Sequence, residues 1–223
     1  MSVVVEELRG RLAAAPGSGL PAGRELLPVR SPLDSLFPGG GLARGSVVAV
    51  EGSVWLALAL VAEASANGSW CAAVGVRDLN PAAAAETGID LTRLVIVDTR
   101  GQLATAVAAL LDGVDVVVVQ PDARSLRPAE ARRLAARARE RRSAILAVGG
   151  WPDACDLTVR LAESRWLGLT PDGYGRLTER RCRVAASGRG AAARERRAHV
   201  TFPLHRVDPR PDPRPRPRAV RPA

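Results

Sequence analysis

Apolar positions along this chain alternate between short continuous runs and segments with helical spacing. The runs predict five strands of one sheet, over 46–50, 70–76, 94–97, 115–120 and 143–148. Helical spacing follows the first four runs and predicts helices over 54–66, 81–87, 102–112 and 128–142. Strands that alternate with helices in this way predict an α/β protein with a doubly wound, mainly parallel sheet.

Some details of this pattern can be read residue by residue. The run 115–120 is D-V-V-V-V-Q, which is typical of a central parallel strand covered on both faces. Ser53 is expected to cap the helix 54–66, and Asn67 and Gly68 are expected to end it. In the helix 128–142 one set of apolar positions shares a side and predicts the buried face: Ala131, Leu134, Ala135 and Ala138.

The pattern changes after Gly150. Short apolar runs predict strands over 157–161, 165–169, 176–186 and 199–204, with Asp172-Gly173 as a turn, and these strands are expected to extend the sheet in antiparallel fashion. An amphipathic helix is expected over 3–15, and alternating prolines predict a disordered or polyproline II tail. The expected organisation is an N-terminal helix and linker (1–28), a core (29–205) and a basic tail (206–223).

Charge is concentrated near the C-terminus. Residues 1–175 hold 18 Arg and 19 acidic residues, a net of −1, whereas residues 176–223 hold 14 Arg and 4 acidic residues, a net of +10. A basic appendage on a near-neutral body indicates a phosphate-rich or acidic partner, and a solubilising tail is the alternative. No aromatic residues interleave these arginines to stack on bases, so nucleic acid and protein both stay open.

Cysteine usage and hydropathy indicate the compartment. Cys71, Cys155 and Cys182 lie far apart without a C-x-x-C pair, which favours reduced core thiols over a metal site. No apolar signal segment or membrane span is expected, because no run of about 18 apolar residues occurs. We therefore expect a cytoplasmic protein without a resident metal.

The stretch 32–53 leads toward a phosphate-binding loop that is missing. A glycine turn precedes the strand 46–50 and a helix follows it, which is the setting of the motif G-x-x-x-x-G-K-[ST]. Only Glu51, Gly52 and Ser53 connect the two elements, and the chain contains no lysine. The backbone cradle, the phosphate-binding amine and the Mg²⁺-binding hydroxyl of such a loop therefore have no residues to form them.

Several ordered segments resemble RecA-type recombinases over about 32–161. They are L-D-S-L-F-P-G-G-G-L-A-R-G-S-V-V-A-V-E-G, L-N-P-A-A-A-A-E-T-G-I-D-L-T-R-L and V-D-V-V-V-V-Q-P-D-A-R-S-L-R-P. The resemblance implies a RecA-like fold but argues against activity. The family's Mg²⁺-holding acid falls on Gln120, its catalytic Glu falls at or beside Arg77, and its polar sensor falls near Gly149 and Gly150. We therefore expect a lost ATPase, with a degenerate nucleotide site and no cofactor.

Among RecA-like proteins without a phosphate loop, the chain is most similar to the actinobacterial ImuA type. The segment W-L-G-L-T-P-D-G-Y-G-R-L-T-E-R-R-C-R-V-A-A-S-G-R-G and the Arg/Pro tail fit that assignment. The resemblance implies a non-catalytic, nucleoid-associated accessory factor of SOS-induced mutagenesis and translesion synthesis. Its partner would be ImuB, a Y-family polymerase relative, and through it an error-prone replicative-type polymerase.

Two alternatives stay open. A SulA-like inhibitor of cell division also resembles a RecA core without a phosphate loop, and it would bind the tubulin-like septum protein. A DNA-dependent recombinase ATPase would need the Lys, the Ser or Thr and the Asp that are missing here. A neighbouring reading frame for a Y-family polymerase relative would favour the mutagenesis role over division control.

Two groups of side chains are candidates for binding. Trp55 and Trp151 are expected where a nucleotide would lie in the active family, either filling the vacated pocket or anchoring a partner. Arg181 and Arg183 are expected on one face of a strand and Arg180 on the other. The candidate contacts for a partner or nucleic acid are Arg181, Arg183, Arg189, Arg194, Arg196 and Arg197. A solvated charged edge strand is the alternative interpretation of these arginines.

Overall fold

The structure is a computed structural model that describes residues 26–77, 79–99, 101–122, 125–170 and 172–202. The helix expected over 3–15 and the basic tail expected over 206–223 lie outside the described residues. Among the described helices, none combines the length and apolar character needed to cross a membrane.

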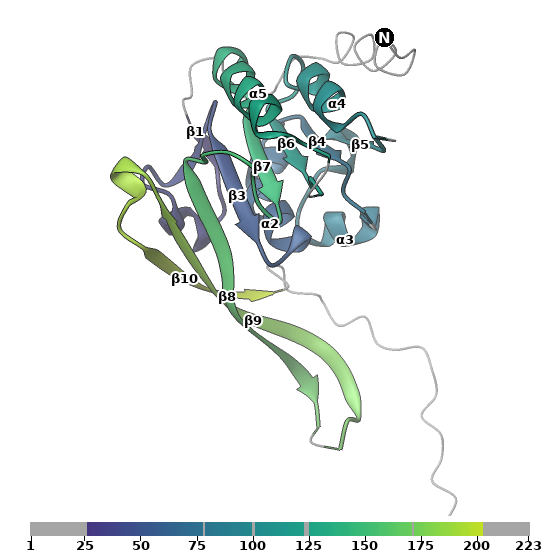
Figure 1. Cartoon of the computed structure of the whole chain (residues 1–223). Coiled ribbons are helices and arrows are strands. Elements are labelled where there is room, and N and C mark those ends of the chain that lie inside the picture. The colour runs from purple at the N-terminus through teal and green to yellow at the C-terminus, as the bar shows by residue number, and fades with distance from the viewer. Residues whose placement is uncertain (1–25, 78, 100, 123–124, 171, 203–223) are drawn as a thin grey trace, which may run out of the picture.

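Eight strands form one sheet in the order β10-β9-β8-β3-β7-β6-β4-β5 (Figure 1). The strands are β3 Val47–Glu51, β4 Cys71–Val74, β5 Leu94–Val97, β6 Val116–Val119, β7 Ala144–Val148, β8 Leu157–Leu169, β9 Gly175–Gly188 and β10 Arg196–Phe202. The helices are α2 Val54–Ala66, α3 Pro81–Glu86, α4 Leu103–Leu110 and α5 Pro128–Arg141. The short 3-10 turns are η1 Leu33–Leu36, η2 Leu91–Arg93 and η3 Gly190–Ala192. Neighbouring strands in the series β8-β3-β7-β6-β4-β5 pair in parallel. Strand β9 is antiparallel to β8, and β10 is antiparallel to β9.

The five strands and four helices expected between residues 46 and 148 are confirmed, with bounds that differ by at most two residues at either end. Helix α2 has the expected bounds; Asn67 is its C-cap residue and is followed by Gly68 with φ +93°. The capping expectation is wrong in one respect. Ser53 occupies the N-cap position with φ −168°, but its side chain makes no capping hydrogen bond.

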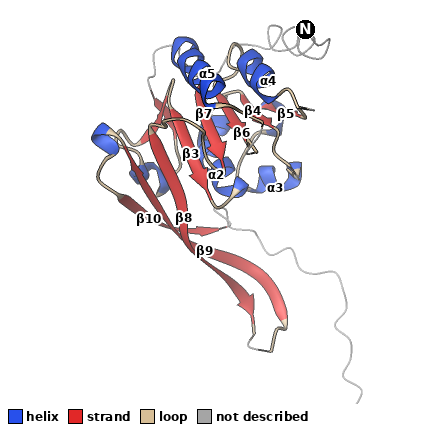
Figure 2. Ribbon diagram, in the orientation of Figure 1, coloured by secondary structure: helices blue, strands red, loops and turns tan. Residues whose placement is uncertain are grey.

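Two strand expectations in the C-terminal half are corrected. The segments 157–161 and 165–169 form one long strand, β8, with a bulge between Leu161 and Glu163. Strand β8 also pairs in parallel with β3, so only β9 and β10 extend the sheet in antiparallel fashion (Figure 2). The expected linker before residue 29 likewise contains a strand, β1 (Leu26–Pro28), which pairs with β2 (Gly41–Ala43).

The core has two halves, one on each face of the sheet. Successive valines of β6 alternate between them: Val116 and Val118 join the half that contains α2, and Val117 and Val119 join the half that contains α4 and α5. Strand β6 is thus a central strand with both faces covered, as its sequence predicts. The expected buried side of α5 is also confirmed, because the four apolar positions that define it are all buried.

Candidate functional site

The carboxyl ends of the parallel strands bring together the residues expected at a degenerate nucleotide site. Strand β3 ends at the exposed Glu51, and only Gly52 and Ser53 separate it from α2. Gly52 has φ +94°, and a Cβ at this position would lie 3.2 Å from the Cβ of Leu161 on β8. The space beside this short connection is therefore occupied by the neighbouring strand.

Gln120 and Arg77 meet at the same edge, after β6 and β4. The backbone N–H of Arg77 donates to the Gln120 side-chain oxygen at 3.3 Å. The Arg77 guanidinium lies 3.7 Å from a carboxylate oxygen of Asp122, and both side chains are exposed. Because β7 lies between β3 and β6, Gln120 is two strands away from Gly52, about 10 Å at ordinary strand spacing. The edge therefore carries an amide and a guanidinium at the positions where the resemblance expects carboxylates.

Trp55 and Trp151 do not fill one pocket together. Trp55 lies in the first turn of α2, packs on the core half that contains that helix, and meets the Phe202 ring edge to face. Trp151 packs on the opposite half, with α4 and α5. The expectation that both tryptophans occupy one vacated nucleotide site is wrong, because the sheet separates them.

The expected arginine surface is present but divided. Cross-strand pairing places Thr201 opposite Arg181 and Ala185 opposite Arg197, so Arg181, Arg183 and Arg197 share one face of β9 and β10. Each of these three arginines forms an ion pair with a glutamate on the same sheet or in the loop before β10: Arg181 with Glu179, Arg183 with Glu163, and Arg197 with Glu195. Arg160 and Arg197 both donate to Glu195 and hold the pKa of that carboxyl below its usual range. These pairs partly neutralise the face.

The other three expected arginines lie elsewhere. Arg189 and Arg194 flank η3 in the loop between β9 and β10, are exposed, and form no ion pair within the part of the chain that the structure describes. Arg196 points to the opposite face from Arg197, and its buried Nε has no hydrogen-bond partner among the described residues. Arg196 is therefore only partly exposed, on the other face of β10 from Arg197.

The β8–β9 hairpin, whose first strand the sequence predicts as two shorter strands, forms a long projection (Figure 1). We define the β8–β9 arm as residues 165–170 and 172–181. Four of the six exposed large hydrophobic side chains among the described residues lie on it: Trp166 (54% exposed), Leu169 (51%), Tyr174 (78%) and Leu177 (46%). The turn expected at Asp172-Gly173 is confirmed, and the hairpin is closed by a backbone hydrogen bond of 2.7 Å from Thr170 N–H to Tyr174 O.

Arg180 connects the arm to the body. Its guanidinium lies 5.1 Å from the Trp166 ring centre and 5.7 Å from the Trp55 ring centre, within cation–π range. Its Nε donates to the Ser164 hydroxyl at 2.7 Å. Trp55 in turn rests on Phe202. The half-exposed Trp166 ring is therefore held by a guanidinium that is itself anchored.

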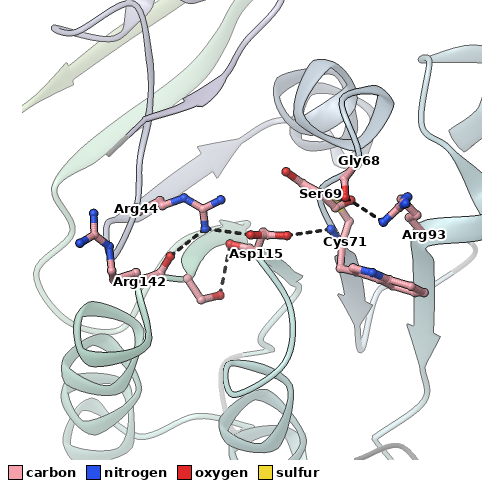
Figure 3. Close-up of polar contacts among 9 residues, drawn as sticks. Arg44, Gly68, Ser69, Cys71, Arg93, Asp115 and Arg142 are labelled. Atoms are coloured by element: carbon pink, nitrogen blue, oxygen red, sulfur yellow. Dashed lines mark hydrogen bonds and ion pairs between the residues drawn. The ribbon is translucent and has the colours of Figure 1, made fainter. Parts of the chain in front are cut away.

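The opposite end of the sheet carries a buried charge pair (Figure 3). Asp115, which is 6% exposed, accepts from Arg44 Nη1 at 2.8 Å and from the Trp70 backbone N–H at 2.9 Å. The same Arg44 nitrogen donates to the Arg142 carbonyl at 3.2 Å. This cluster ties the start of β6 to β2, β4 and α5 at the amino ends of the strands. We interpret it as structural, because it lies away from the edge where parallel sheets bind ligands.

The three cysteines are free thiols, as expected. Cys71 and Cys182 are buried, whereas Cys155 is only partly buried. Burial, together with the nearby Asp115 charge, raises the pKa of the Cys71 thiol to about 12. Because thiolates carry cysteine reactivity, we expect Cys71 to react slowly in the folded protein.

Taken together, these features define an α/β protein with a mainly parallel central sheet and antiparallel C-terminal strands. The sequence matches the family described as the MT3502 N-terminal domain over residues 35–153, and the chain belongs to this family. It is 36% identical over 166 residues to the uncharacterized protein Rv3395c of Mycobacterium tuberculosis, covering 69% of this chain and 80% of that protein. The family match ends just before β8 begins at Leu157, so the arm lies outside it.

Proposed function

We propose that this protein is a RecA-like, non-catalytic accessory factor of the ImuA type in SOS-induced mutagenesis and translesion synthesis. It would bind a Y-family polymerase-like protein (ImuB) and, through it, an error-prone replicative-type polymerase. The RecA-like motif order in the sequence supports this proposal, and a relative in a mycobacterium fits an actinobacterial assignment.

The observation that carries the proposal is the connection between β3 and α2. In a phosphate-binding loop this connection supplies a series of backbone N–H groups, a lysine and a hydroxyl. Here it consists of Gly52 and Ser53, with Leu161 of β8 packed beside it. Room for phosphate groups on this side of the connection would require displacing Leu161, the residue after the last β8 residue that pairs with β3. A binding role therefore fits this sheet edge better than nucleotide hydrolysis.

The first test is nucleotide binding by the purified full-length protein. Equilibrium dialysis with radiolabelled ATP and Mg²⁺, with and without single-stranded DNA, is expected to show no saturable binding and no phosphate release. A phosphate-loop ATPase measured in parallel serves as the positive control. Saturable Mg²⁺-dependent ATP binding would overturn the non-catalytic proposal and revive the recombinase alternative.

The second test is affinity capture of the tagged protein from damaged cells of its own species, with identification by mass spectrometry. Recovery of a Y-family polymerase relative supports the proposal. Recovery of the tubulin-like septum protein without such a polymerase would favour division inhibition instead.

A pair of charge reversals tests which surface the partner contacts. Arg189→Glu combined with Arg194→Glu changes the two exposed arginines beside η3, and we expect it to reduce recovery of the partner. Arg133→Glu on the exposed side of α5 makes the same type of change far from this loop and should leave recovery unchanged. Equal recovery from all three proteins would exclude the η3 loop as the contact.

A further inference from the structure

The β8–β9 arm combines exposed aromatic rings with arginines. Over residues 165–181 the chain has four arginines and two acidic residues, a net charge of +2. The aromatic side chains of the arm, Trp166 and Tyr174, are also its two most exposed large hydrophobic groups. The sequence places both before residue 176, but the hairpin brings Trp166 directly opposite Arg180. Folding thus supplies the interleaving of rings and arginines that the linear sequence of the basic region lacks.

The arginines of the arm fall into two groups. Arg180 and Arg181 are engaged, the first with the Trp166 ring and Ser164, the second with Glu179. Arg165 and Arg176 are exposed and form no ion pair with any other described residue. Two guanidinium groups of the arm therefore remain available to an anionic ligand. Arg165 pairs across the hairpin with Arg181, so it lies on the other face of the strand from Trp166.

We propose that the β8–β9 arm binds single-stranded nucleic acid, with Trp166 and Tyr174 stacking on bases and Arg165 and Arg176 contacting phosphates. Aromatic rings in a basic setting are the usual platform for unpaired bases, because every base has a face to stack on. In a duplex the base faces are already covered, so these rings would gain nothing from it. This inference deepens the proposed function by giving the accessory factor a direct contact with an exposed template.

A protein partner is the other class of ligand for such an arm, since Trp, Tyr and Arg also dominate protein interfaces. The observations favour nucleic acid for an electrostatic reason. Burying Arg165 and Arg176 against a protein would require acids placed at both positions, because an unpaired buried charge is costly. A phosphate backbone supplies a negative charge at every nucleotide without such placement.

The test measures binding of the full-length protein to a fluorescein-labelled oligothymidine of 20 nucleotides by anisotropy. Affinities of the variants are compared at one salt concentration, and a series of salt concentrations gives the salt dependence. Trp166→Ala and Tyr174→Ala are each expected to weaken binding about 5- to 150-fold, the range for loss of one stacked base. Arg165→Gln and Arg176→Gln should each reduce the slope of log affinity against log salt by about 0.7. Ile96→Ala, which removes a comparably exposed apolar side chain on β5, is the matched control and should change nothing.

Two further measurements separate stacking from other causes. Intrinsic tryptophan fluorescence should be quenched by the oligonucleotide, and Trp166→Phe should abolish most of the quenching while keeping most of the affinity. Circular dichroism checks that Trp166→Ala leaves the fold intact. Tyr174→Ala provides an independent result, because that side chain is 78% exposed and little packing is lost.

Two outcomes would overturn the inference. One is equal oligonucleotide affinity for wild type, Trp166→Ala and Tyr174→Ala, which would assign binding to arginines elsewhere in the chain. The other is loss of polymerase-partner capture in these variants without any change in oligonucleotide binding, which would make the arm a protein-docking surface. A third result separates the two proposals. If capture with the wild-type protein recovers no polymerase relative but oligonucleotide binding still depends on Trp166, the proposed function is refuted and this inference stands.

Discussion

Replacing Asp115 with asparagine tests the buried charge pair at the amino end of the sheet. Asp115→Asn keeps the size of the side chain and an oxygen that can accept from the Trp70 backbone N–H. It removes the negative charge that faces Arg44 at 2.8 Å. Arg44 is only 13% exposed, so its positive charge would remain largely buried without compensation.

The expected loss follows from this geometry. Removing one partner of a buried ion pair costs about 3–5 kcal/mol. We expect the lower end, about 3 kcal/mol, because Arg44 keeps its hydrogen bond to the Arg142 carbonyl. For a chain of this length that corresponds to a decrease in Tm of roughly 6–12 °C.

Urea denaturation followed by circular dichroism measures this loss, with the m-value expected to stay constant. Arg77→Ala is the control, because its ion pair with Asp122 joins side chains that are 81% and 59% exposed. We expect the control to cost under about 1 kcal/mol. The double variant, which carries both Arg44→Met and Asp115→Asn, should lose less unfolding free energy than the two single variants lose in sum. A cost for Asp115→Asn no larger than that of Arg77→Ala would refute the interpretation of the cluster as a buried pair.

Three other outcomes are expected. Gly52→Ala should lower the unfolding free energy by about 1–3 kcal/mol in urea denaturation, because φ is +94° and the new Cβ would press on Leu161. Gly101→Ala is the control and should lower it less, because φ is also positive there but the space around the new Cβ is open. In the native protein Cys155 should react with a thiol reagent well before Cys71, whose pKa is raised to about 12 by burial, and denaturant should abolish the difference. The pKa of Glu130 is lowered, chiefly because its carboxylate accepts a hydrogen bond from the backbone N–H of Arg127, the N-cap residue of α5. Its charge therefore stabilises the fold above the unfolded pKa of about 4.3, and this contribution is lost as pH falls through the lower folded value. Glu130→Gln should therefore be less stable than wild type at pH 7 and converge with it in acid; a constant difference across pH would contradict this.

The regular elements between residues 46 and 148 could be predicted because their patterns are local. Four valines in a row between polar ends indicate a strand buried on both faces, and β6 is such a strand. The four apolar positions of α5 recur at helical spacing, and they are the buried ones. The absence of a phosphate loop was equally readable, since it depends only on how many residues join β3 to α2.

The candidate sites depended on contacts between distant residues. Which strands β8 pairs with cannot be read from its own sequence. Its first residues pair in parallel with β3, and its antiparallel pairing with β9 continues from Leu157 to Leu169 and forms the arm. The same holds for Asp115 and Arg44, which are 71 residues apart in the sequence.

The tryptophans illustrate the same limit most directly. Trp55 and Trp151 both follow central strands, yet they lie on opposite faces of the sheet. Trp166 and Arg180, in contrast, are brought face to face by the hairpin register. The spacing of apolar residues along a chain indicates which side of a helix or strand is buried, because the geometry of that one element determines which positions share a side. The neighbour that covers each side is selected by packing of the whole chain, and it is this selection that places a ring beside a guanidinium.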